Sequence, residues 1–192
     1  ASAVLTTDDT TYLGIALDNF AGDLIGLEDL LVFHAYGVDA GINSAKQNGA
    51  AATKLNWKTF ATSSGLDISS ELTALNATSI GDLSAGVDLS INGNVALDVL
   101  SGTLVATTAF DLKLGQVKSA VLPTPAQDAD AMTLTLLGAN VFLGSGGSLL
   151  DNNGGTATPA DYSDDTVKNG TLGFRATAAK LTLVSLKDRG AS

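Results

Sequence analysis

Apolar and polar residues alternate along the chain from Leu83 to Val99. The odd-numbered positions of this run are apolar or small, whereas the even-numbered positions are mostly Asp, Ser and Asn. A period of two is typical of a strand with one face against a core and the other in solvent. At roughly 3.3 Å per residue an unbroken strand of this length approaches about 55 Å, whereas most strands have about five or six residues. The run therefore predicts either one very long strand or two strands joined by a turn.

A change of phase after Val99 predicts a hairpin. From Leu100 onward the apolar residues occupy even-numbered positions. A reversal at Ser101-Gly102 explains this change, because it places odd apolar residues opposite even ones, with Gly93 facing Phe110. A three-residue turn at 92–94 would preserve the same alternation, so a second reversal there stays open.

Two further runs alternate in the same way, at residues 132–144 and 170–187, and two more strand-like runs lie at residues 11–20 and 30–43. Single slips in the alternation at Leu136-Leu137 and at Ala178-Ala179 indicate β-bulges. Apolar residues between 20 and 31 also have helical spacing, so one short helix near 20–31 is possible. The expected fold is all-β, as an elongated antiparallel or solenoid-like module.

Pro123 and Pro125 mark the best internal boundary, because proline cannot continue a central strand. This boundary at 123–131 predicts one β subdomain at 1–122 and a second at 132–192. The second subdomain would continue into a neighbouring repeat or copy, and a single continuous domain is the alternative reading.

The amino-acid composition argues against several classes of function. Twenty acidic residues against ten basic ones give a net charge of −10, and Glu28 and Glu71 are the only acids that are not Asp. Without a cluster of Lys or Arg we expect no nucleic-acid partner. The uncharged run 131–150 is rich in Gly and hydroxyl residues, which favours paired strands over a bilayer helix, so we expect no membrane insertion. The lack of cysteine excludes disulfides and thiolate metal sites.

Catalytic motifs are missing, so we expect no enzyme. His34 is the only histidine, and the phosphate-binding, nucleophile-elbow and zinc-protease motifs do not occur. A structural, hydrogen-bonded role is the better interpretation of His34. Paired carboxylates such as Asp164-Asp165 are adjacent in sequence and look like solvated turn residues rather than the acid and base of a hydrolase. Trp57 is expected to pack against a sheet.

A Gly-rich loop between residues 144 and 170 gathers carboxylate and amide side chains. Such oxygen ligands on a flexible backbone are the ligands that Ca²⁺ uses, although the spacing matches neither an EF-hand nor a nonapeptide calcium repeat. Calcium is the one possible cofactor, and an ordinary solvated loop is the alternative. The candidate ligands are Asp151, Asn153, Asp161, Asp164 and Asp165.

The order of the segments along the chain is similar to the order within one unit of a tandem repeat. "LNWKTF" (55–60), the hairpin, "MTLTLLGANVFLGSGG" and "GTLGFRATAAKLTLVSLKD" are followed, in the repeating order, by "TYLGIALDNFAGDLIGLEDL", which here lies at the N-terminus. This series resembles the long tandem repeats of giant secreted or surface proteins of Gram-negative bacteria, which are adhesin-like. The resemblance implies a structural or adhesive role outside the cell or at its surface, with no catalytic residues.

The leading hypothesis from the sequence is therefore a repeat or subunit of an extracellular filament, stalk or surface appendage. Its partners would be copies of itself or adjacent repeats, joined by pairing of the apolar strands near the two ends of the chain. A calcium-dependent adhesin or ligand-binding β domain is the alternative. The residues expected at the joint are Tyr12, Leu13, Ile15 and Leu17 in the first strand, and Leu181, Leu183 and Leu186 in the last.

Overall fold

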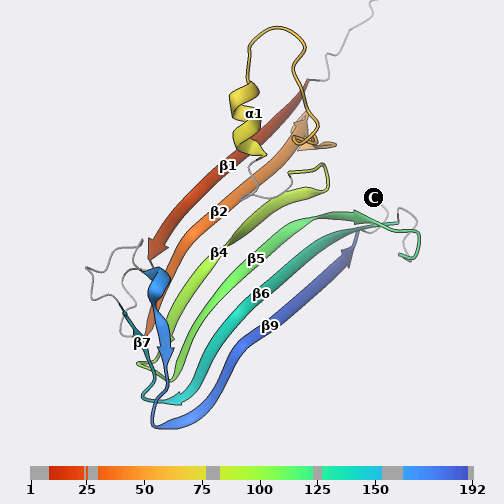
Figure 1. Cartoon of the computed structure of the whole chain (residues 1–192). Coiled ribbons are helices and arrows are strands. Elements are labelled where there is room, and N and C mark those ends of the chain that lie inside the picture. The colour runs from red at the N-terminus through yellow and green to blue at the C-terminus, as the bar shows by residue number, and fades with distance from the viewer. Residues whose placement is uncertain are drawn as a thin grey trace, which may run out of the picture.

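A computed structural model describes residues 9–23, 25, 30–76, 83–122, 127–152 and 162–189. These residues form one long antiparallel sheet with the strand order β1-β2-β4-β5-β6-β9 (Figure 1). The all-β expectation is confirmed. The strands are β1 (Thr10–Asp23), β2 (Leu31–Gln47), β4 (Val87–Val99), β5 (Leu104–Lys118), β6 (Asp128–Ser145) and β9 (Leu172–Asp188), and the short β3 (Ala50–Ala51) pairs with β2.

The hairpin register follows the prediction. Leu89 lies opposite Leu114 and Gly93 lies opposite Phe110, as the change of phase requires. Strand β4 continues through 92–94, so the alternative reversal does not occur there. The turn is wider than a two-residue loop, because β4 ends at Val99 and β5 begins at Leu104. Within this turn Leu100, Ser101 and Gly102 adopt φ angles of 52°, 50° and 87°.

Irregularities lie at the same level in neighbouring strands and bend the sheet. The register slips near Asn19 in β1, near Gly37 in β2, after Thr107 in β5, and near Gly138 and Ala178 in β6 and β9. The bulges predicted in β6 and β9 are thereby confirmed. Bulges add local twist and curvature to a strand. We call this row the crease; it comprises Asn19, Gly37, Gly93, Thr108, Gly138 and Ala178.

Glycine at position 93 is required by the crease. A Cβ there would lie 2.9 Å from the Cα of Val38, which belongs to the bulge of the neighbouring strand β2. The missing side chain thus leaves room for the bulge, and the ring of Phe110 lies opposite on β5. A local feature of the sequence, Asn92-Gly93-Asn94, therefore marks a bend within one strand rather than a reversal.

The pairing registers divide the sheet into two faces. One face, here called the apolar face, is aliphatic across all the long strands. Its side chains include Leu13, Ile15, Leu17, Phe33, Ile42, Leu89, Ile91, Val95, Leu97, Leu104, Phe110, Leu112, Leu134, Leu136, Val141, Leu143, Phe174, Leu181 and Leu183. The opposite face, here called the capped face, bears mostly small and polar residues, such as Ser90, Asn92 and Asp111.

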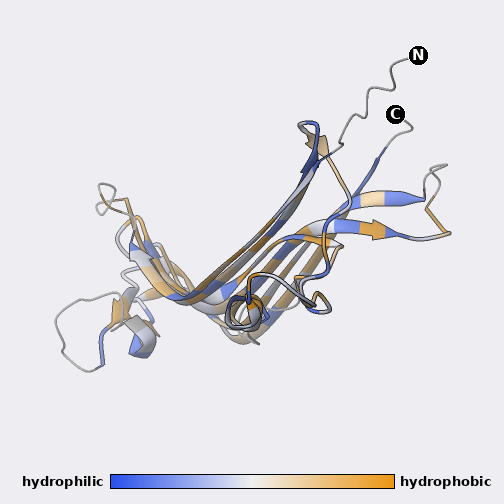
Figure 2. Cartoon of the chain, turned by 90° about the horizontal axis from the view of Figure 1, so that it is seen from above, coloured by the Kyte–Doolittle hydropathy of each residue, from blue (hydrophilic) through white to orange (hydrophobic). Residues whose placement is uncertain are grey.

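Segments outside the sheet cover the capped face at its two ends. The first cap, residues 52–76 and 83–86, contains α1 (Ser69–Leu75) and packs Trp57, Leu72 and Leu83 into a buried cluster on Ala16 of β1. The second cap, residues 146–152 and 162–171, contains β7 (Ser148–Leu150), β8 (Thr166–Lys168) and the short helix η1 (Tyr162–Asp164). Figure 2 shows the bent sheet with α1 and the second cap on the same side of it.

Two expectations differ from the structure. The helix near 20–31 is wrong where it can be checked, because Phe20–Asp23 belong to β1 and Leu31 begins β2; positions 24 and 26–29 lie outside the described residues. The described helix α1 forms instead at Ser69–Leu75, and the polar loop at 144–170 contains β7 and β8.

Strand β5 ends before the proline-containing boundary at 123–131, and β6 begins within it at Asp128. The two strands are neighbours in the same sheet. Their pairing extends from Leu104 opposite Leu143 to Lys118 opposite Asp128. Within the described chain, no helix is both long enough and apolar enough to cross a membrane.

Candidate assembly edges and acidic cluster

The sheet has open edges at β1 and β9. Within the described residues each of these strands pairs with a single neighbour, β1 with β2 and β9 with β6. All the residues predicted at a joint lie on these edges. Those exposed at 42–52% of their surface are Tyr12, Leu13, Leu17, Leu181, Leu183 and Leu186, and Ile15 is half-buried.

The register places these residues on both faces of the sheet. Leu13, Ile15, Leu17, Leu181 and Leu183 lie on the apolar face, because they align with Ser44, Ile42, Ala40, Leu136 and Leu134 respectively. Tyr12 and Leu186 lie on the capped face, since they align with Ala45 and Ala131. A neighbouring strand on either edge would thus contact apolar side chains on both of its faces.

The two edges differ in charge. Strand β1 carries Asp18 and Asp23 and no basic residue. Strand β9 carries Arg175, Lys180 and Lys187 against one acid, Asp188. In a chain with ten basic residues, three lie in this one strand. The edges are therefore electrostatically complementary to each other, and each would repel a second copy of itself.

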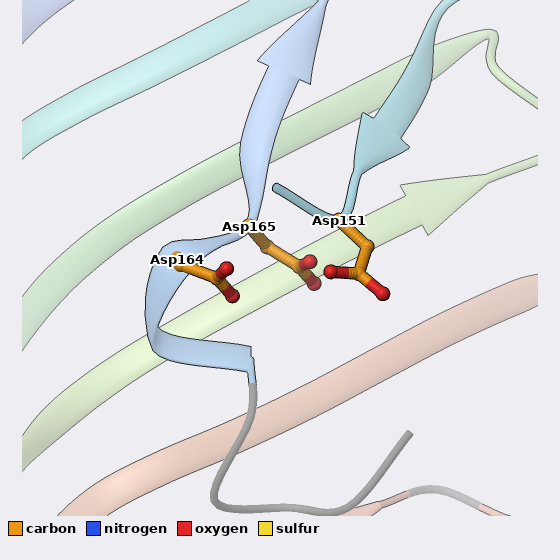
Figure 3. A group of neighbouring side chains, drawn as sticks. All are labelled: Asp151, Asp164 and Asp165. Carbon is orange, nitrogen blue, oxygen red and sulfur yellow. The ribbon is translucent and has the colours of Figure 1, made fainter. Parts of the chain in front are cut away.

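The acidic cluster brings together part of the predicted calcium loop. Carboxylate oxygens of Asp151, Asp164 and Asp165 lie within 4.8 Å of one another. Asp151 follows β7, whereas Asp164 ends η1 and Asp165 precedes β8, so the pairing of β7 with β8 converges them (Figure 3). The other two predicted ligands, Asn153 and Asp161, lie outside the described residues.

Polar contacts hold the backbone around the acidic cluster. The side-chain amide of Asn152 donates to the carbonyl oxygen of Asp164 at 2.6 Å and to Oγ1 of Thr166 at 3.1 Å. Oδ1 of Asp164 is buried and has no hydrogen-bond partner among the described residues. Burial, and then the negative charges of Asp165 and Asp164, raise the pKa of Tyr36 on β2. The cluster therefore creates a negative potential on the capped face, of the kind a divalent cation neutralises.

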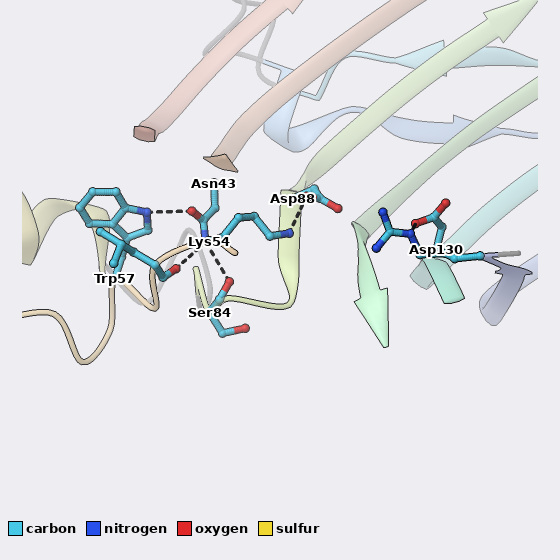
Figure 4. Close-up of polar contacts among 8 residues, drawn as sticks. Asn43, Lys54, Trp57, Ser84, Asp88 and Asp130 are labelled. Atoms are coloured by element: carbon cyan, nitrogen blue, oxygen red, sulfur yellow. Dashed lines mark hydrogen bonds and ion pairs between the residues drawn. The ribbon is translucent and has the colours of Figure 1, made fainter. Parts of the chain in front are cut away.

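The first cap is anchored by a polar residue that the sequence did not single out (Figure 4). Asn43 is 1% exposed, and its amide nitrogen donates to the carbonyl oxygens of Leu55 and Ser84, both at 2.9 Å. Its Oδ1 accepts the indole N–H of Trp57 at 2.9 Å. Nearby, the ammonium of the buried Lys54 pairs with Asp88. The sequence does contain an indication of this site, because Asn43 is a polar residue within a strand, and a buried Asn side chain must find hydrogen-bond partners.

His34 joins the edge strand to its neighbour. Its Nδ1 lies 2.9 Å from Oδ1 of Asp23, so the contact links β2 to the end of β1. The hydrogen-bonded position agrees with the structural interpretation of this histidine. Trp57 packs against β1, as the sequence predicted.

Comparisons of the chain with protein-family models, with curated proteins and with solved structures found no match.

Proposed function

We propose that this chain is a structural module of an extracellular or cell-surface filament or stalk, whose copies or adjacent repeats join by pairing β9 of one unit with β1 of the next. The observation that carries the proposal is the presence of two long open edges with opposite charge on one sheet. Long unprotected edges are templates for pairing with another strand, and isolated proteins usually block them.

Strand direction supports a head-to-tail joint. The long strands alternate in direction across the sheet, and β9 therefore runs antiparallel to β1. When a second unit lies beside the first in the same orientation, its β1 continues the antiparallel order after β9. The crease includes Asn19 on one edge and Ala178 on the other, so the bend also continues from unit to unit.

Charge selects the partner edge. The acidic β1 meets the basic β9, whereas β1 against β1 or β9 against β9 places like charges together. A contact between two different surfaces does not close on itself unless the rotation per unit happens to form a ring, and it otherwise extends into a filament.

The apolar face provides the second contact for stacking. Several of its large side chains are exposed, among them Leu143 at 53% and Phe174 at 70%. Six long strands about 4.8 Å apart and about 43 Å long give this face an area of about 1,200 Å². A standard interface buries about 800 Å² on each partner. The face is thus large enough to hold two units together, and apolar patches of this size on a protein surface are generally interaction sites.

Sedimentation velocity combined with negative-stain electron microscopy tests the proposal. The purified chain at neutral pH should form elongated assemblies. Reversal of the edge charge by Lys180→Glu with Lys187→Glu should slow assembly at least tenfold and leave the sheet content unchanged. Lys118→Glu with Lys168→Glu changes the net charge equally, away from either edge strand, and should assemble like the wild type. A wild-type chain that stays monomeric at all concentrations, or two double variants that behave alike, would overturn the proposal.

The acidic cluster supports a second candidate function, a calcium-dependent adhesive or ligand-binding domain. The supporting observation is the convergence of three carboxylates from both ends of the 151–165 segment within 4.8 Å. Oxygen ligands brought together from two chain segments allow a cation to stabilise the second cap. Calcium would then stabilise one end of the module, and the two functions are compatible in a single surface protein.

A further inference from the structure

An open groove with both polar and apolar lining lies on the capped face between the two caps, at the crease. Its volume is about 480 Å³, and β4 and β5 form its floor. Small-molecule sites commonly have about 300–1,000 Å³. Gly37 and Gly93 line the groove without side chains and leave it open. The side chains that give it chemical character are Ser90, Asn92, Asn94, Asp111, Lys113 and Leu137.

Two of the residues that line this groove each have a buried polar atom that lacks a hydrogen-bond partner among the described residues. Ser90 is 1% exposed, and its Oγ is buried and unpaired. Oδ1 of Asp111 is also buried and unpaired, although Oδ2 of the same carboxylate accepts a hydrogen bond from Lys113 at 3.0 Å. Buried polar atoms in native proteins are nearly always paired, and an unpaired one costs about 1–3 kcal/mol. Atoms of this kind complete their hydrogen bonds with an ordered water or with a polar group of a bound ligand.

The residues that line the groove determine which class of ligand it can bind. The amide of Asn94 offers both donors and an acceptor, Asp111 offers an acceptor and Lys113 a donor. Because the carboxylate and the ammonium pair with each other, the groove has little net charge and favours a neutral ligand over an ion. Leu137 supplies an apolar surface beside these groups.

We propose that this groove binds a neutral sugar unit of a glycan. A sugar ring combines hydroxyl groups that donate and accept with an apolar C–H surface, which matches the polar floor and Leu137. Because Oδ1 of Asp111 and Oγ of Ser90 are both buried, the ligand's hydroxyls would pair with them once the side chains that cover these atoms move. The groove lies away from β1 and β9, so sugar binding and assembly are independent properties.

Equilibrium dialysis tests the proposal, because it works for monomeric and assembled protein alike. The probes are labelled glucose, galactose, mannose and N-acetylglucosamine, each titrated into the high millimolar range. At least one should bind saturably, and Asp111→Asn should weaken it at least tenfold. Asp188→Asn, which removes the same charge from the exposed strand β9, should bind like the wild type.

Ser90→Ala separates a binding role from a structural one. Removing an unpaired buried hydroxyl should leave the free protein as stable as the wild type or more stable, and should weaken sugar binding several-fold. The proposal is overturned if none of the four sugars binds saturably, or if Asp111→Asn and Ser90→Ala both bind as tightly as the wild type.

Discussion

The indole ring of Trp57 lies directly over Gly14 of β1. A Cβ at position 14 would lie 2.8 Å from Cε2 and 3.0 Å from Nε1 of the ring. This close approach fixes the first cap on the sheet, because the same indole N–H reaches Asn43 on the neighbouring strand. The absence of a side chain at one position of an edge strand thus decides where the buried cluster of Trp57, Leu72 and Leu83 can form.

Gly14→Ala should displace Trp57 and destabilise the chain by about 1–3 kcal/mol, the usual cost of overpacking. The chain has a single tryptophan, so its fluorescence during urea unfolding reports on this contact directly. Gly22→Ala is the matched control on the same strand, because a Cβ there meets nothing within 4 Å. Equal stability and equal emission spectra of the two variants would show that the ring does not rest on Gly14.

Asn43→Ala should cost about 2–4 kcal/mol, because it leaves the buried indole N–H of Trp57 and two partly buried carbonyl groups without their partner. Asn140→Ala is the control, since within the described parts of the chain its amide makes only a local contact to the carbonyl of Gly138. Chemical denaturation followed by circular dichroism measures both. A loss below about 1 kcal/mol for Asn43→Ala would mean that water replaces these bonds without cost.

Asp39 gives the stability a predictable pH dependence. Partial burial and the neighbouring Asp18 carboxylate raise the pKa of Asp39 above its usual 3.8, although the N–H of Asn19 opposes this shift. Because the folded chain binds this proton more tightly than the unfolded chain, ionisation of Asp39 destabilises the fold as pH rises through its titration.

Asp39→Asn keeps an acceptor for the N–H of Asn19, which lies 2.8 Å from Oδ1. At neutral pH the variant should be more stable than the wild type by about 0.5 kcal/mol, the scale of surface charge interactions. The difference should vanish below the usual pKa. Asp67→Asn should behave oppositely, since the N–H of Ser69 lowers the pKa of Asp67. The ionised carboxylate of Asp67 stabilises the folded chain at neutral pH, and this stabilisation is lost as the carboxylate becomes protonated on acidification. Thermal melts across this pH range measure both variants; a wild type as stable as Asp39→Asn at neutral pH contradicts the prediction.

Calcium should raise the melting temperature if the acidic cluster binds it. At ten times the dissociation constant the stabilisation is about 1.4 kcal/mol. The double variant Asp164→Asn with Asp165→Asn should lose this effect, whereas Asp188→Asn should retain it. Magnesium should act more weakly, because it demands a tighter octahedral set of ligands. A wild-type melting temperature that does not change at millimolar calcium would exclude the site.

Regular parts of the fold could be predicted because alternation and turn chemistry act locally. The register of Gly93 with Phe110 follows from the change of phase after Val99, and the slips near Leu136 and Ala178 correspond to real bulges. These features need no knowledge of distant residues. The edge positions of Leu13 and Leu183 also follow, because the first and last strands of a meander occupy its two edges.

Features that depend on distant contacts escaped prediction. Helix α1 has seven residues, too few to form from local propensity, and it exists because Leu72 packs on Trp57. The expected helix near 20–31 was wrong at Phe20 because strand pairing with Val38 outweighed the helical spacing. The convergence of Asp151 with Asp164 likewise requires the pairing of β7 with β8, which a Gly-rich sequence does not reveal.

Disulfide trapping tests the central claim, the joint between β9 and β1, most directly, because the chain contains no cysteine of its own. Leu13 and Leu183 both lie on the apolar face, one on each edge, and neighbouring strands bring Cα atoms close enough for a disulfide. Two double variants test two possible registers of the joint. They are Leu13→Cys with Leu183→Cys, and Ile15→Cys with Leu183→Cys. The control, Leu66→Cys with Leu183→Cys, places one thiol off the edges.

Non-reducing electrophoresis after mild oxidation reads out the result. Head-to-tail pairing predicts a ladder of covalent oligomers for at least one edge pair, and no oligomer beyond a dimer for the control. Only monomers and dimers in both edge pairs, or an internal disulfide that joins β1 to β9 within one chain, would contradict the proposed assembly.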